Sequence, residues 1–349
     1  MPMERLSPAR SQDLASNTAG VMLRTGRAQD RAGRLDEAAA AYQQAAQLAD
    51  GGAEQPVLVE ALRRLAVIHF RRNNPEEARQ LCRRSLREAI LLGEEALAGE
   101  ALNALAGFEA ECGELNAARA LYVNGLALAG TSAALRGRIE QNLGILASIQ
   151  GDQDDAIKHY RSSLAAFEQA SDEGGAAIAY HNLGLVSSRR GQLEDADRSF
   201  NQSAALSNRT GDIYLAGICE LSRAEVANLR QQYSAALRRA EAALEIFEQL
   251  GTRSAQSSAH RIIGMILRES GRTALAEERL RKAIALAQET GSPLYEAEAA
   301  RELARLHQEA GQKQEAADYF TSAHRLFRKL DAKLEVDEVS RRMVELAAV

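Results

Sequence analysis

The 349-residue sequence has no tryptophan, and phenylalanine and tyrosine together make up only 4% of it. Strands are enriched in aromatic and β-branched residues, so this shortage argues against a β fold. The apolar residues that remain are mainly alanine, leucine and isoleucine, which suit a core built by stacking helix on helix. As one compact globule, a chain of this length would form two domains, whereas an array of stacked units grows by adding units.

Signals for export and for membrane insertion are also missing. The sequence has no run of 18 apolar residues, and residues 1–12 lack the apolar core of a secretory signal. Its three cysteines, Cys82, Cys112 and Cys219, show no close pairing, which is typical of reduced thiols. We therefore predict a cytoplasmic protein without a membrane partner.

A basic excess is absent too. The net charge is −5 and the isoelectric point about 5.8. Proteins that bind nucleic acids usually carry a basic stripe or excess, so a nucleic-acid partner is not expected.

The sequence contains no pattern typical of catalysis or metal binding. None of the six histidines belongs to an HExxH motif or stands at zinc-ligand spacing from a cysteine. The glycines are spread one to a turn instead of clustering before a helix, as a phosphate-binding loop requires. Acidic pairs such as Glu76-Glu77 fall near expected helix starts, where they interact favourably with the helix dipole. We predict no enzymatic activity, no metal and no cofactor.

What the sequence does contain is a repeat of about 40 residues. Each copy is expected to form two helices joined by a short turn, because apolar residues recur at three- and four-residue steps. Successive turns are 40 residues apart, except for 38 between the third and the fourth. The turn residues are Gly33, Asn73, Gly113, Gly151, Gly191, Gln231, Gly271 and Gly311.

Other columns stay in phase with the turn. The residue seven positions before it is always glycine or alanine, the residue five after it is always alanine, and the residue twelve after it is always small. The residue nine after it is usually large, as with Phe200, but is Cys82 in the second repeat and Ala240 in the sixth. Small residues at a helix crossing let the backbones approach to the lower end of the usual range of about 8–10 Å. The larger residue would fill the space between them, so Cys82 is predicted to be buried.

These columns predict an all-α fold in which residues 13–331 form eight stacked helical hairpins. Residues 1–12 contain Pro2 and Pro8 and are expected to form a flexible tail. Residues 332–349 form one more amphipathic helix, which should cap the last apolar face. The third repeat is two residues short, and the loss falls in its second helix, before Gly130.

The same columns resemble those of the tetratricopeptide repeat. In the fifth hairpin the residues that carry the resemblance are Tyr180, Leu183, Gly184, Ala196, Phe200 and Ser203, while Asn208 replaces the closing proline of the motif. The period of 40 exceeds the common 34 and is similar to that of kinesin light chains, cell-polarity adaptors and bacterial sensory regions. The resemblance implies a right-handed superhelix whose first helices line a concave groove, but it does not specify a partner.

In such a groove, the residues three and two positions before the small site and one after it should point inward. They are mostly amides in the middle of the array and arginines toward its ends. The candidate partner-binding residues are Arg63, Arg64, Asn103, Gln141, Asn142, His181, Asn182, Arg261, Arg301 and Arg305. Amides suit the backbone of an extended peptide, and arginines suit carboxylates or phosphates. Alternatively these are polar residues on an unused face, although asparagine is a poor residue for helix interiors, which favours a role for Asn142 and Asn182.

Two functions fit this pattern. The first is a non-enzymatic scaffold or adaptor that holds a protein or peptide in its groove. The alternative is a sensory or regulatory region of a bacterial signalling or transcription regulator, whose effector domain is absent from these 349 residues. Self-association through residues 332–349 is compatible with either. A receptor for chaperone tails is not expected, because Ile218 and Ser222 stand where its clamp has lysine and arginine.

Overall fold

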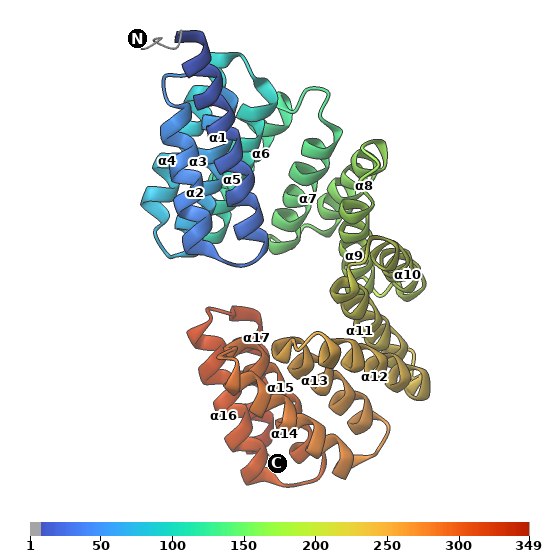
Figure 1. The fold of residues 1–349 in the computed structure, drawn as a ribbon. Helices are drawn as coiled ribbons and strands as arrows, with labels where there is room; N and C mark the ends of the chain where they lie inside the picture. Colours follow the sequence, from blue (N-terminus) through green and yellow to red (C-terminus); the bar gives the residue numbers. More distant parts are fainter. Residues whose placement is uncertain (1–7, 349) are drawn as a thin grey trace. The chain divides into compact units, whose positions relative to one another are not determined.

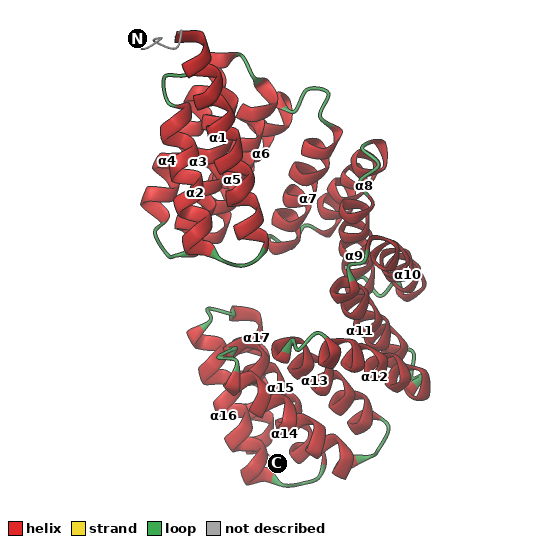
Figure 2. Cartoon of the chain, viewed as in Figure 1, coloured by secondary structure: helices red, strands yellow, loops and turns green. Residues whose placement is uncertain are grey.

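Helices make up nearly all of the chain in the computed structural model, and no strand occurs among the residues that it describes, 8–348 (Figures 1 and 2). Side chains are described for residues 19–347. The first helix begins at Pro8, so residues 8–12 are helical and not part of a tail as predicted. Residues 1–7 of the predicted tail lie outside the described residues.

The chain divides into two compact units, residues 1–175 and 176–349. The helices of the first unit are α1 (Pro8–Arg31), α2 (Leu35–Ala49), α3 (Gln55–Arg71), α4 (Pro75–Leu92), α5 (Glu95–Glu111), α6 (Leu115–Leu128), α7 (Ala133–Ile149) and α8 (Gln153–Gln169). Helix α9 (Glu173–Arg189) starts in unit 1 and continues in unit 2. The other helices of unit 2 are α10 (Leu193–Thr210), α11 (Ile213–Leu229), α12 (Tyr233–Gln249), α13 (Arg253–Glu269), α14 (Thr273–Glu289), α15 (Pro293–Glu309), α16 (Lys313–Lys329) and α17 (Lys333–Ala348).

Within each unit, every odd-numbered helix packs against the even-numbered helix that follows it, and the even-numbered helix packs against the next hairpin. In unit 1 this holds for α1 to α8, and in unit 2 for α10 to α17. The first helices also contact one another directly: α1, α3, α5 and α7 form a layer in unit 1, and α11, α13 and α15 form one in unit 2 (Figure 1). The predicted all-α array of helical hairpins is confirmed. Helix α6, with 14 residues, carries the shortening expected in the third repeat.

The turn column of the sequence corresponds to a single backbone conformation. All eight turn residues have positive φ, between 59° and 86°. Glycine adopts this left-handed conformation without the penalty that a β-carbon brings, which explains its use in six of the eight turns. Asn73 and Gln231 are the two exceptions.

The small and large columns meet inside each hairpin. A β-carbon on Gly184 of α9 would lie only 2.6 Å from the ring of Phe200 on α10, so the ring occupies the space that glycine leaves. Glycine also stands opposite Tyr42, Tyr160 and Leu280. Where the large column holds Cys82 or Ala240, the sequence has alanine at the small site, and both of these residues are fully buried as the column requires.

Ala196 of α10 tests this packing. The residue is completely buried, so Ala196→Leu is expected to lower the free energy of unfolding by about 1–3 kcal/mol through overpacking. Gln192→Leu, at an exposed position just before the same helix, should cost much less. Thermal melts of the two variants compare these effects, and equal melting temperatures would contradict the assignment of Ala196 to the helix crossing.

Candidate functional site

All ten candidate residues lie on first helices and are partly exposed. Those from Arg63 to Asn142 belong to unit 1, and those from His181 to Arg305 belong to unit 2. They therefore form two sets, one in each unit. Asn142 and Asn182, the two asparagines for which the sequence favours a binding role, lie in different units, and a shared role for them remains a prediction.

The arginines of unit 1 are paired with carboxylates of neighbouring helices. Arg63 of α3 lies 3.7 Å from Glu100 of α5, and Arg64 lies 2.5 Å from Glu60 on its own helix. Glu60 also accepts a hydrogen bond of 3.0 Å from Nε of Arg27 on α1. Burial raises the pKa of Glu60, but the hydrogen bonds from Arg27 and Arg64 outweigh it and hold the pKa below its ordinary value. A bound anion would have to compete with these carboxylates for the guanidinium groups.

The arginines at the end of unit 2 are paired in the same way. Arg301 of α15 donates to Glu338 of α17 at 3.0 Å, and Arg305 also pairs with Glu338. Arg305 lies 2.9 Å from Glu302, which is 1% exposed and is also 3.4 Å from Arg268 of α13. Carboxylates of the chain itself therefore neutralise this cluster.

A fixed spacing underlies these pairs. Arg261 of α13 lies 3.3 Å from Glu298 of α15 and 3.7 Å from Glu225 of α11. The pairs Arg63–Glu100, Arg261–Glu298 and Arg301–Glu338 are each separated by 37 residues. Because this is about one helical turn less than the repeat of 40 residues, the glutamate falls beside the arginine on the next first helix. This spacing is the signal by which the sequence could have shown the pairing.

Two of the three candidate amide side chains of unit 1 are joined by a hydrogen bond. Asn142 of α7 donates through Nδ2 to Oδ1 of Asn103 on α5 at 3.0 Å. Asn142 thus links two first helices. Oε1 of Gln141, next to it in the sequence, is buried and has no hydrogen-bond partner among the described residues.

His181 of α9 lies in a largely apolar environment. Its ring is 5.5 Å from that of Phe200, and its Nε2 is 3.5 Å from the hydroxyl of Ser222. Burial lowers the pKa of His181 to about 4, so the ring is neutral at neutral pH. His181 can offer a partner a hydrogen bond but no positive charge.

This lowered pKa predicts a pH dependence of stability. The unfolded chain binds a proton with the ordinary pKa of 6.5, whereas the folded chain does so only near 4. Acid therefore favours the unfolded state, and stability should be complete above about pH 6.5 and fall as the pH drops toward 4. Since one pKa unit corresponds to about 1.4 kcal/mol, the loss from His181 is at most about 3.5 kcal/mol.

Thermal melts at pH 7 and pH 5 measure this effect. His181→Gln removes the titrating ring, so the melting temperature of the variant should differ less between the two pH values than that of the unmodified protein. An unchanged difference would show that His181 does not contribute to the acid sensitivity.

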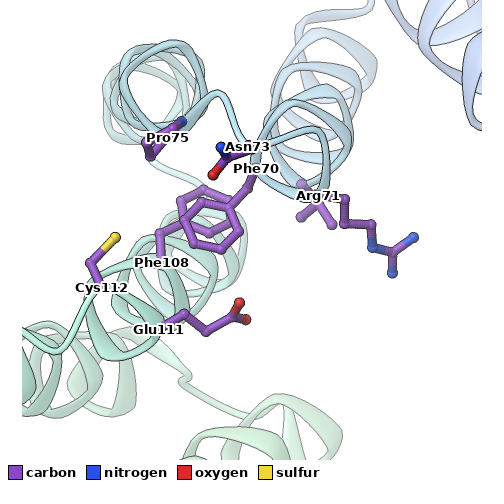
Figure 3. Close-up of a pocket in the computed structure, with 8 residues that line it drawn as sticks. Phe70, Arg71, Asn73, Pro75, Phe108, Glu111 and Cys112 are labelled. Atoms are coloured by element: carbon purple, nitrogen blue, oxygen red, sulfur yellow. The ribbon is translucent and has the colours of Figure 1, made fainter. Parts of the chain in front are cut away.

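A pocket that the sequence analysis did not identify lies in unit 1, beside the α3–α4 turn. It measures about 540 Å³ and is lined by Val67, Phe70, Arg71, Asn73, Pro75, Phe108, Glu111 and Cys112. The rings of Phe70 and Phe108 stack at 4.5 Å between centroids, with 11° between their planes. Figure 3 shows the rings between Asn73 on one side and Glu111 on the other, with Arg71 pointing away from them.

Among the described residues, no group of three or more histidine, cysteine or acidic side chains is placed to hold a metal ion. None of the helices within the same range combines the length and the apolar character needed to cross a bilayer. Cys82 and Cys219 are buried free thiols, whereas Cys112 is exposed.

Comparison with known proteins identifies the repeat. Two models of the tetratricopeptide repeat match the chain, one over residues 23–91 and the other over residues 254–329. The chain is a tetratricopeptide-repeat protein. The first match runs from the last part of α1 through α2, α3 and α4, and the second covers α13–α14 and α15–α16. A search of curated proteins found no match.

Several solved structures share this tetratricopeptide-repeat fold. A signal transduction ATPase with a tetratricopeptide-repeat sensor from Pyrococcus horikoshii has 15% identity and a TM-score of 0.69, over 95% of this chain and 50% of the other. A Rap protein complexed with competence and sporulation factor has 13% identity and a TM-score of 0.58, over 98% of both chains. A tetratricopeptide-repeat protein from Parabacteroides merdae has 15% identity and a TM-score of 0.58, over 81% of this chain and 98% of the other. The present chain thus spans half the length of the Pyrococcus protein, and at these identities the likeness concerns the fold.

Proposed function

We propose that the chain is a non-enzymatic scaffold that binds an extended segment of a protein partner across α5 and α7 of unit 1. The observation that carries the proposal is the buried Oε1 of Gln141, which has no hydrogen-bond partner among the described residues. Such an acceptor costs about 1–3 kcal/mol when unsatisfied. If the Gln141 side chain turns outward on binding, a backbone N–H of a bound segment would supply the missing donor.

The neighbouring amides support this location. One hydrogen bond joins Asn103 to Asn142, and an asparagine side chain has two donor hydrogens and an acceptor with two lone pairs. The pair therefore retains both donors and acceptors for a peptide backbone. Ile145, one helical turn after Gln141, is 39% exposed and offers an apolar contact beside them.

The charges of the first helices argue for the same region. Toward the start of unit 1 and the end of unit 2, a carboxylate of a ligand would compete with glutamates already paired to the arginines. The amides of α5 and α7 present no such competition. The fold likeness to a Rap protein solved with competence and sporulation factor is consistent with a binding function for this repeat array.

The test begins with peptides selected from a random displayed library on the unmodified protein. Gln141→Ala combined with Asn142→Ala should weaken their binding by about ten- to a hundredfold, because each lost hydrogen bond is worth about 0.5–1.5 kcal/mol. Arg83→Ala combined with Arg87→Ala, at exposed positions on α4, serves as the control and should leave the affinity unchanged. Unchanged affinity of the amide variant, with helicity intact by circular dichroism, would place the partner elsewhere.

A second candidate function is that of a sensory region, which the fold likeness to the Pyrococcus protein with its tetratricopeptide-repeat sensor supports. A sensor changes conformation when its ligand binds, whereas a passive scaffold needs no such change. One spectroscopic label on the exposed Cys112 and another on a cysteine introduced in unit 2 would report the distance between the units. A shift in that distance on adding a selected peptide favours the sensor, and a constant distance favours the scaffold.

A further inference from the structure

Phe70 is the unusual residue of the pocket beside the α3–α4 turn. It stands three positions before the turn, where the other seven repeats have Asp30, Ala110, Ser148, Ser188, Asn228, Arg268 and Gln308. Hairpin packing therefore requires no aromatic side chain in this column. Phe70 nevertheless stacks on the nearly buried Phe108 and remains partly exposed to the pocket.

The charges at the pocket are unequal. Arg71 donates to Asp30 of α1 at 3.1 Å, and its guanidinium points away from the rings (Figure 3). Glu111 forms no ion pair with any residue in the described part of the chain, and its side chain lines the pocket. The charge that lacks a partner at this pocket is therefore negative.

Aromatic faces next to an unpaired carboxylate favour a planar cation. An arginine guanidinium stacks on aromatic rings, is more weakly hydrated than an ammonium group, and matches a carboxylate with two parallel hydrogen bonds. A lysine ammonium is compact and strongly hydrated, so it gains less from the rings. The side-chain amide of Asn73, on the other side of the rings, can supply one further hydrogen bond (Figure 3).

We propose that this pocket binds an arginine side chain of a protein partner, stacked on Phe70 and paired with Glu111. The site lies near the α3–α4 turn and is separate from the amides of α5 and α7, so it would act as a second anchoring point for a partner. It does not depend on the partner-binding role proposed for those amides.

The exposed thiol of Cys112 provides a direct readout, because it lines the pocket. Burial raises the pKa of the other two thiols, to about 12 for Cys82 and about 11 for Cys219, so an alkylating reagent reacts selectively with Cys112 near neutral pH. We would measure the alkylation rate of the full chain with N-acetyl-arginine amide, with the uncharged N-acetyl-citrulline amide, and with the apolar N-acetyl-norleucine amide, at matched ionic strength.

The arginine probe should slow alkylation with a midpoint on the order of 1 mM, a typical affinity for so small a ligand. The citrulline and norleucine probes should protect at least about threefold less well, because they lack the charge that pairs with Glu111. Glu111→Gln should abolish this preference for arginine. Phe70→Ser, which introduces the residue of the fourth and fifth repeats, should weaken protection by about tenfold through loss of the stacking face.

Glu114→Gln serves as a matched control, because Glu114 is an exposed carboxylate in the α5–α6 turn, three residues after Glu111, and does not line the pocket. It should retain the preference for arginine. Equal protection by the norleucine probe would overturn the proposal in favour of an apolar ligand. Failure of all three probes to protect Cys112, or an unchanged preference for arginine in Glu111→Gln, would also overturn the proposal. This holds whether or not the variant of Gln141 and Asn142 binds peptides more weakly.

Discussion

Glu302→Ala is expected to lower the free energy of local unfolding around α13 to α17 by about 3 kcal/mol. Glu302 is 1% exposed and pairs with Arg305, Arg268 and Arg301 at 2.9, 3.4 and 3.8 Å. Removing one partner of a buried ion pair typically costs about 3–5 kcal/mol, because the opposite charge is left buried. The lower end of that range applies here, since each of the three arginines has a further carboxylate partner.

Hydrogen exchange of the backbone amides of α15, measured on the full chain by mass spectrometry, reports this local free energy. The control is Glu309→Ala, which removes a carboxylate 2.5 Å from Arg268 that is 56% exposed. Exposed ion pairs contribute about 0–1 kcal/mol, so this change should be small. Equal effects of the two variants would mean that burial of Glu302 does not contribute to the stability of the cluster.

Phe200→Ala is expected to cost about 3–5 kcal/mol, because it leaves a cavity in the middle of the α9–α10 hairpin. The side chain is 1% exposed and lies against Gly184. Gly184→Ala should also destabilise the hairpin, by about 1–3 kcal/mol, because its β-carbon would lie 2.6 Å from the ring. These two costs should not add in the double variant.

The double variant, Gly184→Ala with Phe200→Ala, recreates the pairing of Ala224 and Ala240 found in the sixth repeat. It should be more stable than Phe200→Ala alone, because the added methyl group no longer clashes and fills part of the cavity. Hydrogen exchange of the backbone amides in α9 and α10, followed as denaturant is added, measures the local free energy of unfolding in all three variants. A double variant less stable than Phe200→Ala would show that the two columns do not compensate each other in size.

Much of this fold could be predicted from the sequence, because its columns reflect local geometry. The turn residues all have left-handed backbones, which glycine favours. Ala196 is fully buried, as its column predicts, and Cys82 is buried against Ala101 of the neighbouring helix α5. Each of these properties repeats every 40 residues or so, and repetition distinguishes it from chance.

The candidate site was less predictable. The repeat pattern indicates on which side of a helix a residue lies, but it does not indicate which side chains of the neighbouring helices contact that residue. Arg63 and Arg301 do lie on the first helices, but the glutamates 37 residues further along neutralise them. The pocket depends on Phe70, which departs from its column. Columns that all repeats share do not indicate Phe70, because it is the one aromatic residue in its column.

The packing of each helix against near neighbours along the chain also has a kinetic consequence. The helix pairs with extensive contacts are adjacent or next but one in the sequence. Proteins dominated by such local contacts fold fast, since little loop-closure entropy is lost before a contact forms. During synthesis on the ribosome, a hairpin such as α3–α4 can therefore dock onto α1–α2 as soon as it emerges, without waiting for distant segments of the chain.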